Sequence, residues 1–162
     1  MKTDGAERRK IMIDLDVVTV AMWDKSENGD SGRKLLQRVV QGEFSMVTPQ
    51  RLFDLISEWK HQPLVMKIKN FYDVYSETII SALKLEKQMG EMRVDRKVLM
   101  NELEALSIKE EDIILVIIAS LFDVGCLATF NRKHLKNNEV RINNVLRKQG
   151  LKGITIALPN EI

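Results

Sequence analysis

Residues 11–18 read Ile-Met-Ile-Asp-Leu-Asp-Val-Val, and they set the interpretation of the whole chain. The apolar run resumes after Asp16 and continues through Val17–Ala21. A short apolar, β-branched segment of this kind predicts a strand that is buried on both faces. A carboxyl group in such a segment is unfavourable unless it is paired or binds a cation. We therefore expect a buried strand with a functional acid, Asp14, at its end.

Strand-like and helix-like segments alternate from this point onward. Residues 28–32, Asn-Gly-Asp-Ser-Gly, predict a turn, after which Asp30 or Ser31 caps a helix that ends at Gly42. Phe44–Val47 predicts a second strand.

The middle of the chain predicts mainly helix. Thr48 and Pro49 fit the N-cap and the first position of a helix. A long helical region is expected over residues 63–85 and a further helix over residues 94–106.

The last third begins with an ambiguous apolar run. Residues 113–119 suit either a strand or a helix, and we favour a helix that starts near Asp112, because Cys126–Thr129 forms a better strand directly after Gly125. Beyond it we expect a helix over residues 132–148 and a strand over residues 154–158. The alternation predicts a three-layer α/β/α fold with a central, mainly parallel sheet, in one domain of residues 1–162.

The composition excludes several classes of protein. Of the 162 residues, 44% are hydrophobic, too many for a disordered chain, and the net charge of +2 is too small to argue for nucleic acid by itself. The one cysteine, Cys126, is expected to be buried and unpaired, while His61 and His134 have no zinc spacing. No segment is apolar for long enough to be a signal peptide or to span a bilayer, so we expect a cytoplasmic protein with no membrane association.

Acidic residues gather where parallel strands end. In such sheets, functional groups lie beyond the carboxyl ends of the strands. This rule points to Asp14, Asp54, Asp112 and Asn131. Carboxylates in one place repel each other unless a cation neutralises them, and hard oxygen ligands favour Mg²⁺ or Mn²⁺. Such a metal can polarise a phosphoryl oxygen and lower the pKa of a bound water, as phosphodiester hydrolysis requires.

The order of these motifs resembles the PIN-domain family, which includes VapC-type toxin ribonucleases. The similar segments are Ile13–Val18, Thr48–Leu55, Asp112–Thr129 and Thr129–Leu135. The resemblance covers most of the chain and is weakest over His61–Lys109, expected to be a helical elaboration.

The resemblance implies an Mg²⁺- or Mn²⁺-dependent endoribonuclease with RNA as substrate, frequent homodimers and, for a toxin, an antitoxin protein as partner. On the matching positions it implies that Asp14, Asp54 and Asp112 hold the metal and that Asn131 completes the catalytic set. Thr129, Arg132 and Lys133 would support the site or contact RNA phosphates.

Two positions depart from the family pattern, and they keep another function open. The family more often has Glu at position 54 and Asp at position 131. Asn131 is neutral and removes a formal charge from the metal site. The alternative is therefore a catalytically weakened module that binds RNA or a protein without cutting.

A few interpretations of single residues stay open. Asp16 is either an additional ligand or a helix cap. Trp23 and Trp59 suit the core or an interface better than base stacking. A receiver-like phosphate acceptor would need its Asp at the end of a central strand, and Asp54 is predicted to lie in a helix.

Overall fold

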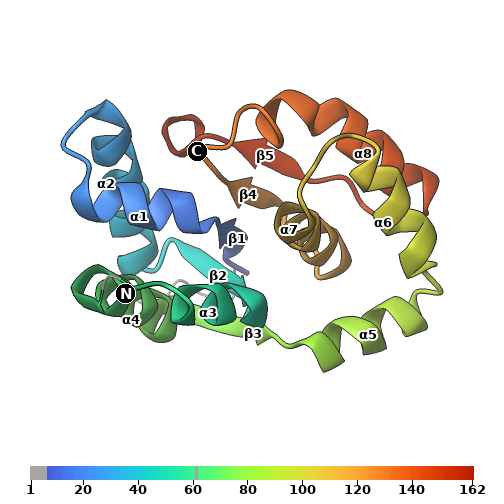
Figure 1. Cartoon of the computed structure of the whole chain (residues 1–162), viewed down its shortest axis with the longest axis horizontal. Helices are drawn as coiled ribbons and strands as arrows, with labels where there is room; N and C mark the ends of the chain where they lie inside the picture. Colours follow the sequence, from blue (N-terminus) through green and yellow to red (C-terminus); the bar gives the residue numbers. More distant parts are fainter. Residues whose placement is uncertain (1–6, 61) are drawn as a thin grey trace.

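The computed structural model describes residues 7–60 and 62–162 and has a five-stranded sheet between two layers of helices (Figure 1). All neighbouring strands pair in parallel. The architecture confirms the predicted three-layer α/β/α fold with a parallel sheet. In sheet order the strands are β3 (Ser76–Ile80), β2 (Phe44–Pro49), β1 (Arg9–Ile13), β4 (Cys126–Ala128) and β5 (Thr155–Ala157).

The helices divide into two groups because the crossovers change direction at β1. From β1 the chain adds β2 and then β3 toward one edge of the sheet, and it returns to add β4 and β5 on the other side of β1. Because crossovers between parallel strands are right-handed, the two directions place their helices on opposite faces of the sheet (Figure 1). One layer holds α1 (Leu15–Trp23), α2 (Glu27–Val40), α3 (Gln50–Ser57) and α4 (Gln62–Tyr75), and the other holds α5 (Ala82–Glu91), α6 (Arg96–Glu104), α7 (Glu110–Leu121) and α8 (Glu139–Lys148). Two single 3₁₀ turns lie at Lys136–Asn138 and Pro159–Glu161.

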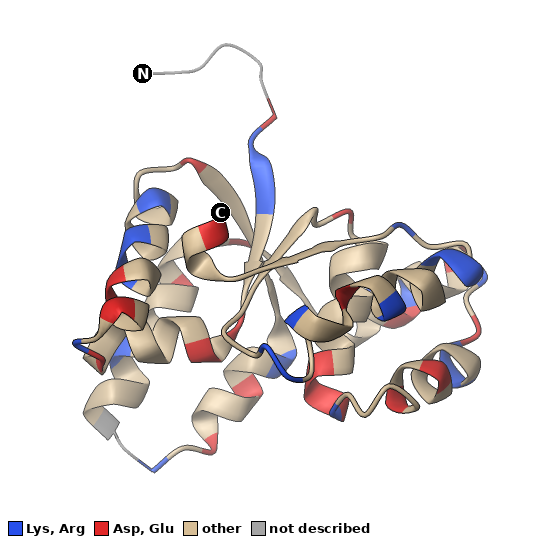
Figure 2. Cartoon of the chain, turned by 90° about the horizontal axis from the view of Figure 1, so that it is seen from above, with Lys and Arg blue, Asp and Glu red and all other residues tan. Residues whose placement is uncertain are grey.

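The core lies on both faces of the sheet. Ile11, Met12 and Ile13 of β1 are at most 1% exposed, which fits a central strand covered by helices on both sides. Cys126 of β4 is a buried free thiol, as predicted. Figure 2 shows the charged residues on the outer helices and loops, with the middle of the sheet almost free of them. Among the described residues, no helix combines the length and the apolar character needed to cross a membrane.

The prediction that the first strand extends through Val17–Ala21 is wrong. The strand ends at Ile13, and these residues belong to α1, for which Asp14 is the N-cap residue. Helix α1 is packed by α2 and α4, so it is apolar on most of its surface and has little helical periodicity. A run of this kind cannot be told from a buried strand by its pattern alone.

The predicted turn at residues 28–32 is also wrong, because these residues form the first turns of α2, which Ser26 precedes as N-cap residue. Neither Asp30 nor Ser31 caps the helix. The glycines permit close approach to α1: a Cβ atom on Gly29 would overlap the carbonyl oxygen of Asp24, and one on Gly32 would lie 3.1 Å from the Cβ of Ala21.

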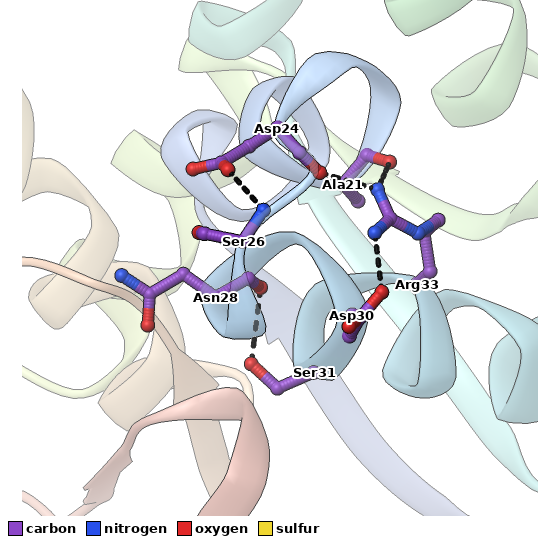
Figure 3. Close-up of polar contacts among 7 residues, drawn as sticks. All are labelled: Ala21, Asp24, Ser26, Asn28, Asp30, Ser31 and Arg33. Atoms are coloured by element: carbon purple, nitrogen blue, oxygen red, sulfur yellow. Dashed lines mark hydrogen bonds and ion pairs between the residues drawn. The ribbon is translucent and has the colours of Figure 1, made fainter.

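An arginine fixes this junction between α1 and α2. Figure 3 shows the guanidinium of Arg33 directed at the end of α1, where its Nη1 donates to the carbonyl oxygens of Ala21 and Asp24 at 2.9 and 2.7 Å. Its Nη2 pairs with Asp30 at 2.6 Å. At the other end of α2, Gly42 has a φ of +80° just after the helix, which confirms the predicted glycine stop.

The helix expected to have Thr48 as its N-cap and Pro49 as its first residue begins one residue later. Thr48 and Pro49 complete β2, and α3 begins at Gln50. The strand continues because Thr48 pairs in register with Ile79 and its hydroxyl bonds that of Ser76 at 2.6 Å.

The neighbouring strand, β3, lies inside the region that was expected to be helical throughout residues 63–85. Its exposed and covered residues alternate, and Ile79, which was expected on an apolar helical stripe, is 41% exposed at the edge of the sheet. The region over His61–Lys109 therefore contributes a strand as well as helices; His61 itself lies outside the described residues.

The remaining elements follow the predictions more closely. The apolar run at residues 113–119 lies in α7, and the strands expected at residues 126–129 and 154–158 are β4 and β5. The helix expected from Arg132 begins only at Glu139. The residues before it form turns, in which Lys136 N–H donates to the carbonyl oxygen of Asn131 at 3.0 Å.

Candidate active site

The candidate site lies between β1 and β4, the two strands at which the crossovers change direction. Ile13 pairs with Ala128, so Asp14 and Thr129 are the first residues beyond the carboxyl ends of the two strands. Asp14 N–H continues the ladder by donating to the carbonyl oxygen of Ala128 at 3.0 Å. The carboxyl end of such a switch point is where open α/β sheets place their ligands.

Thr129 links the two strand ends through its side chain. Its hydroxyl donates to Oδ2 of Asp14 at 2.9 Å and lies 3.4 Å from Oδ2 of Asp16. The backbone N–H of Phe130 is 3.2 Å from both carboxylate oxygens of Asp16. Asp16 therefore lies beside Asp14 at the Thr129 hydroxyl and accepts from Phe130 N–H, instead of capping α1.

Asp112 reaches the same place from α7. It lies in the first turn of that helix, where the positive end of the helix dipole stabilises a carboxylate. Asn131 Nδ2 donates to Oδ2 of Asp112 at 3.1 Å, and Asn131 Oδ1 accepts from the N–H of His134 at 3.0 Å. Both polar atoms of the Asn131 amide are therefore hydrogen-bonded, and its Nδ2 holds Asp112 in position.

A buried tyrosine, Tyr72, forms a hydrogen bond to the end of β1. The hydroxyl of Tyr72, on α4, donates to the carbonyl oxygen of Ile13 at 2.8 Å, immediately before Asp14. Burial, and then the charge of Asp14, raise the pKa of Tyr72, so this group stays a neutral donor. Its aromatic ring packs edge-on against Phe53 and Phe71.

Burial raises the pKa of all three acids, and the charge of a neighbouring carboxylate adds to the shift in each case. Burial, followed by the charges of Asp16 and Asp112, raises the pKa of Asp14 to about 8. Burial raises the pKa of Asp16 to about 6 against the lowering effect of its bond from Phe130. The pKa of Asp112 is also raised, mainly by burial, and the nearby His134 lowers it in part.

In the part of the chain that the structure describes, no lysine or arginine forms an ion pair with these three carboxylates. Carboxylates that crowd each other without a basic partner favour either retained protons or a bound cation. The site is therefore chemically suited to bind positive charge.

The acids open into a pocket of about 450 Å³ that has two different walls. One wall is acidic and polar, and the other is apolar and comes from α1 and α3. The first wall consists of Asp14, Asp16, Lys109, Glu111, Asp112 and Asn131, and the second includes Val20, Trp23, Leu52, Leu55 and Trp59.

The structure does not bring Asp54 into this group. Asp54 is exposed on α3, whereas Leu52 and Leu55 of the same helix line the pocket. At about 100° of rotation per residue, Asp54 lies roughly 200° around the helix from Leu52. Arg132 and Lys133 are exposed on the loop that follows Asn131, beside the pocket lining and not in it.

The side-chain oxygens of the site are of the chemical type that binds a divalent cation, but they are few. Oxygen ligands suit Mg²⁺ or Mn²⁺, and Mg²⁺ is commonly held by one or two carboxylates together with waters. Within residues 7–60 and 62–162, however, no three or more His, Cys, Asp or Glu side chains are arranged to hold a metal ion. The pocket lining holds the carboxylates of Asp14, Asp16 and Asp112, but these side chains do not form a closed set of metal ligands.

Several residues of the site were not expected from the sequence. Trp23 is 63% exposed, whereas Trp59 is partly buried and packs against the core, and both line the pocket. Of the residues that the structure describes, Lys109 is the one basic side chain in the lining of this pocket. The stripe of Asp16, Val20 and Trp23 along α1 would have indicated this wall if the segment had been recognised as a helix.

Comparisons with known proteins support the fold. No family model matches the chain, and no curated protein matches it in sequence. A chain in the crystal structure of VapBC2 from Rickettsia felis bound to a DNA fragment from their promoter is similar in structure, with a TM-score of 0.54 and 15% sequence identity. The match covers 92% of this chain and 98% of that chain. At this identity the likeness is one of fold, and it confirms the PIN-like architecture that the sequence predicted.

Proposed function

We propose that this chain is a metal-dependent endoribonuclease, with Asp14 and Asp112 as the residues that hold Mg²⁺ or Mn²⁺. The observation that carries the proposal is the crowding of three carboxylates, none in an ion pair with a described lysine or arginine, at the switch point of the sheet and in the mouth of a pocket. A cation would relieve their repulsion. The PIN-like fold supports the choice of RNA as substrate.

Each residue of the site has a separate task in this proposal. Thr129 orients Asp14, and Asn131 orients Asp112, through the bonds of 2.9 and 3.1 Å. When bound, the cation would supply Lewis acidity toward a phosphoryl oxygen. Asp16, whose pKa of about 6 lies near neutrality, is placed to accept a proton at its carboxylate. Because a cation beside it would lower this pKa, Asp16 would be ionised in the loaded site.

A second candidate is a module of the same fold that binds RNA without cutting it. Two observations favour it: the described residues hold no group of three metal-binding side chains, and the residues of α3 that face the pocket are apolar. Under this alternative, RNA binding would be indifferent to Mg²⁺, and no substitution of an acid would change a cleavage rate.

A protein partner is a further part of the proposal. The crystal structure of similar fold contains VapBC2 from Rickettsia felis. By that likeness we propose that this chain acts as a toxin that a cognate antitoxin protein restrains. Homodimer formation remains a prediction from the sequence resemblance.

The test is cleavage of a mixed pool of labelled RNAs in Mg²⁺, Mn²⁺ or EDTA. The native chain would be compared with Asp14→Asn, shown to be folded by circular dichroism. Asp73→Asn is the matched control, because Asp73 is an exposed acid on α4 outside the pocket. We expect cutting that needs metal, is lost in Asp14→Asn and is unchanged in Asp73→Asn.

Two results would count against the nuclease. Equal cutting by the native chain and Asp14→Asn would identify a contaminant as the source of activity. RNA binding without cutting in any metal would favour the non-cleaving module.

A further inference from the structure

The apolar wall of the pocket carries the two tryptophans of the chain, Trp23 and Trp59. Trp23 ends α1 and leaves 63% of its surface exposed, while Trp59 follows α3 and is partly exposed. An exposed tryptophan is unusual in a chain that has only two, and here both rings line the pocket that also holds the acids. Flat, accessible aromatic rings next to a phosphate-processing site are a recurring platform for unpaired bases.

The spacing along α1 connects this wall to the acids. Asp16, Thr19, Val20 and Trp23 all line the pocket and follow the i, i+3, i+4, i+7 pattern of one helix face. At 1.5 Å per residue, Trp23 lies about 10 Å along the helix axis from Asp16. A ring at this separation is too far to touch a phosphate held at the acids, but it is close enough for a base attached near that phosphate.

We propose that Trp23 and Trp59 form a base-stacking subsite, which binds the nucleobase of a nucleotide next to the cleaved phosphodiester in single-stranded RNA. The inference rests on the proposed function. Leu52, Leu55 and Val20 supply an apolar surface for the base edge, and a pocket of about 450 Å³ is within the usual range for a small-molecule site.

The subsite selects against paired RNA. In an A-form duplex the bases are stacked on each other and their faces are covered, so neither tryptophan can reach them. Unstacked bases in loops or single strands present a free face to a ring. Lys109, on the opposite wall, is placed to neutralise a phosphate of the same nucleotide.

The test uses the intrinsic fluorescence of the two tryptophans. A single-stranded RNA 12-mer, its complementary duplex and an oligoarginine peptide would be titrated into the native chain in EDTA. Because the chain has no other tryptophan, any quenching arises from this wall. We expect saturable quenching by the single strand and little by the duplex.

The variants separate stacking from folding. Trp23→Leu and Trp59→Leu should each weaken single-strand binding on the order of 10-fold. Trp23→Phe and Trp59→Phe keep an aromatic face, so each should bind single-stranded RNA within about 3-fold of the native chain. Each of these variants also keeps one tryptophan as the fluorescent reporter. Val140→Ala is the control, because Val140 is 73% exposed on α8 and does not line the pocket. In Mn²⁺, the leucine variants should raise KM for cleavage and leave kcat near the native value, as expected for uniform binding.

The outcomes separate this inference from the nuclease proposal. Cleavage with an unchanged KM in the leucine variants would overturn the subsite and leave the nuclease intact. Aromatic-dependent quenching without cleavage in any metal would support the subsite and remove the nuclease. Quenching by oligoarginine alone would overturn the inference in favour of a basic peptide as occupant. If the leucine variants do not fold, the phenylalanine variants decide: loss of RNA binding in both would contradict stacking.

Discussion

The two walls of the pocket come from different parts of the fold and carry opposite chemistry. The acidic wall is built from the ends of β1 and β4, the first turn of α1 and the start of α7, and hydrogen bonds hold Asp14, Asp16 and Asp112 there. The apolar wall comes from one face of α1 and one face of α3, and it presents leucine and tryptophan side chains. In the proposed function the acidic wall acts on a phosphate, whereas the apolar wall offers an aliphatic and aromatic surface for the rest of the ligand.

The difference between the walls shows where a buried carboxylate is tolerated in such a fold. The strand ends and a helix N-terminus offer backbone and side-chain donors, so buried acids are satisfied there. The pocket face of α3 offers no such donors, and Leu52 is 3% exposed. An acid at that position would be desolvated without compensation.

The largest effect should follow the loss of a proposed metal ligand on the acidic wall. We expect Asp112→Asn to lower metal-dependent cleavage by about 100-fold or more, beyond the loss of 10- to 100-fold that is typical of outer-shell partners. The measurement is kcat/KM on a labelled RNA in Mn²⁺. Cleavage within 3-fold or so of the native rate would remove Asp112 from the catalytic set.

A positioning residue of the same wall should have a smaller effect. Thr129→Val keeps the shape of the side chain and removes the hydroxyl that donates to Asp14 at 2.9 Å. We expect a loss of about 10- to 100-fold in metal affinity or rate. Because that bond lowers the pKa of Asp14, its removal should also shift the rate profile to higher pH. A profile unchanged in Thr129→Val would contradict the positioning role.

An acid at position 131, where the family pattern has Asp, should increase the difference in charge between the two walls. Asn131→Asp places a carboxylate beside Asp112 and can still accept from the N–H of His134. Isothermal titration with Mn²⁺ should show affinity raised on the order of 10-fold, since a further carboxylate beside Asp14, Asp16 and Asp112 adds charge to the site. The same variant should melt at a lower temperature in EDTA because of like-charge repulsion. Unchanged Mn²⁺ affinity would show that position 131 is outside the reach of the cation.

The pH dependence of stability tests the acidic wall without any substrate. The pKa of Asp14 is raised to about 8 and that of Asp16 to about 6, so the folded state holds protons more tightly than the unfolded state. This contribution is present below their ordinary pKa of 3.8 and is lost as pH rises through about 6 and then about 8. Each kcal/mol lost lowers Tm by about 2–4 °C for a chain of this size.

We therefore expect Tm in EDTA to fall between pH 5 and 8.5 or so, and to fall less in Asp14→Asn. Added Mn²⁺ should reduce the fall in the native chain, because a cation stabilises the ionised carboxylates. Parallel pH profiles for the native chain and Asp14→Asn would show that Asp14 does not titrate in this range.

The smallest effect is expected for Asp54. Its side chain is exposed on the outer side of α3, so Asp54→Asn should leave Mn²⁺ affinity, cleavage and Tm unchanged within error. Isothermal titration and cleavage assays beside Asp112→Asn provide the measurement. A loss comparable to that of Asp112→Asn would mean that α3 turns its acid toward the cation in the loaded protein.

Much of the fold follows from local sequence. Alternating apolar segments and helical stripes predict a parallel α/β/α fold, and Gly42 marks the end of a helix as expected, whereas at the end of α7 the positive φ belongs to Asp123 and not to Gly125. The rule that functional groups lie beyond strand ends placed Asp14, Asp112, Thr129 and Asn131 correctly at one edge of the sheet. The same rule also pointed to Asp54, which the structure leaves outside this group.

Other features depend on which surface each segment meets in the folded chain. Val17–Ala21 is helical because α2 and α4 cover it, and Gly29 and Gly32 permit a helix crossing instead of a turn. Whether Asp54 or Leu52 faces the pocket depends on the rotation of α3 about its axis, which packing sets. A sequence pattern identifies the residues of a helix. The neighbouring elements determine which face of that helix is buried and which faces the pocket. In α1 and α3 this packing places apolar side chains in the pocket wall.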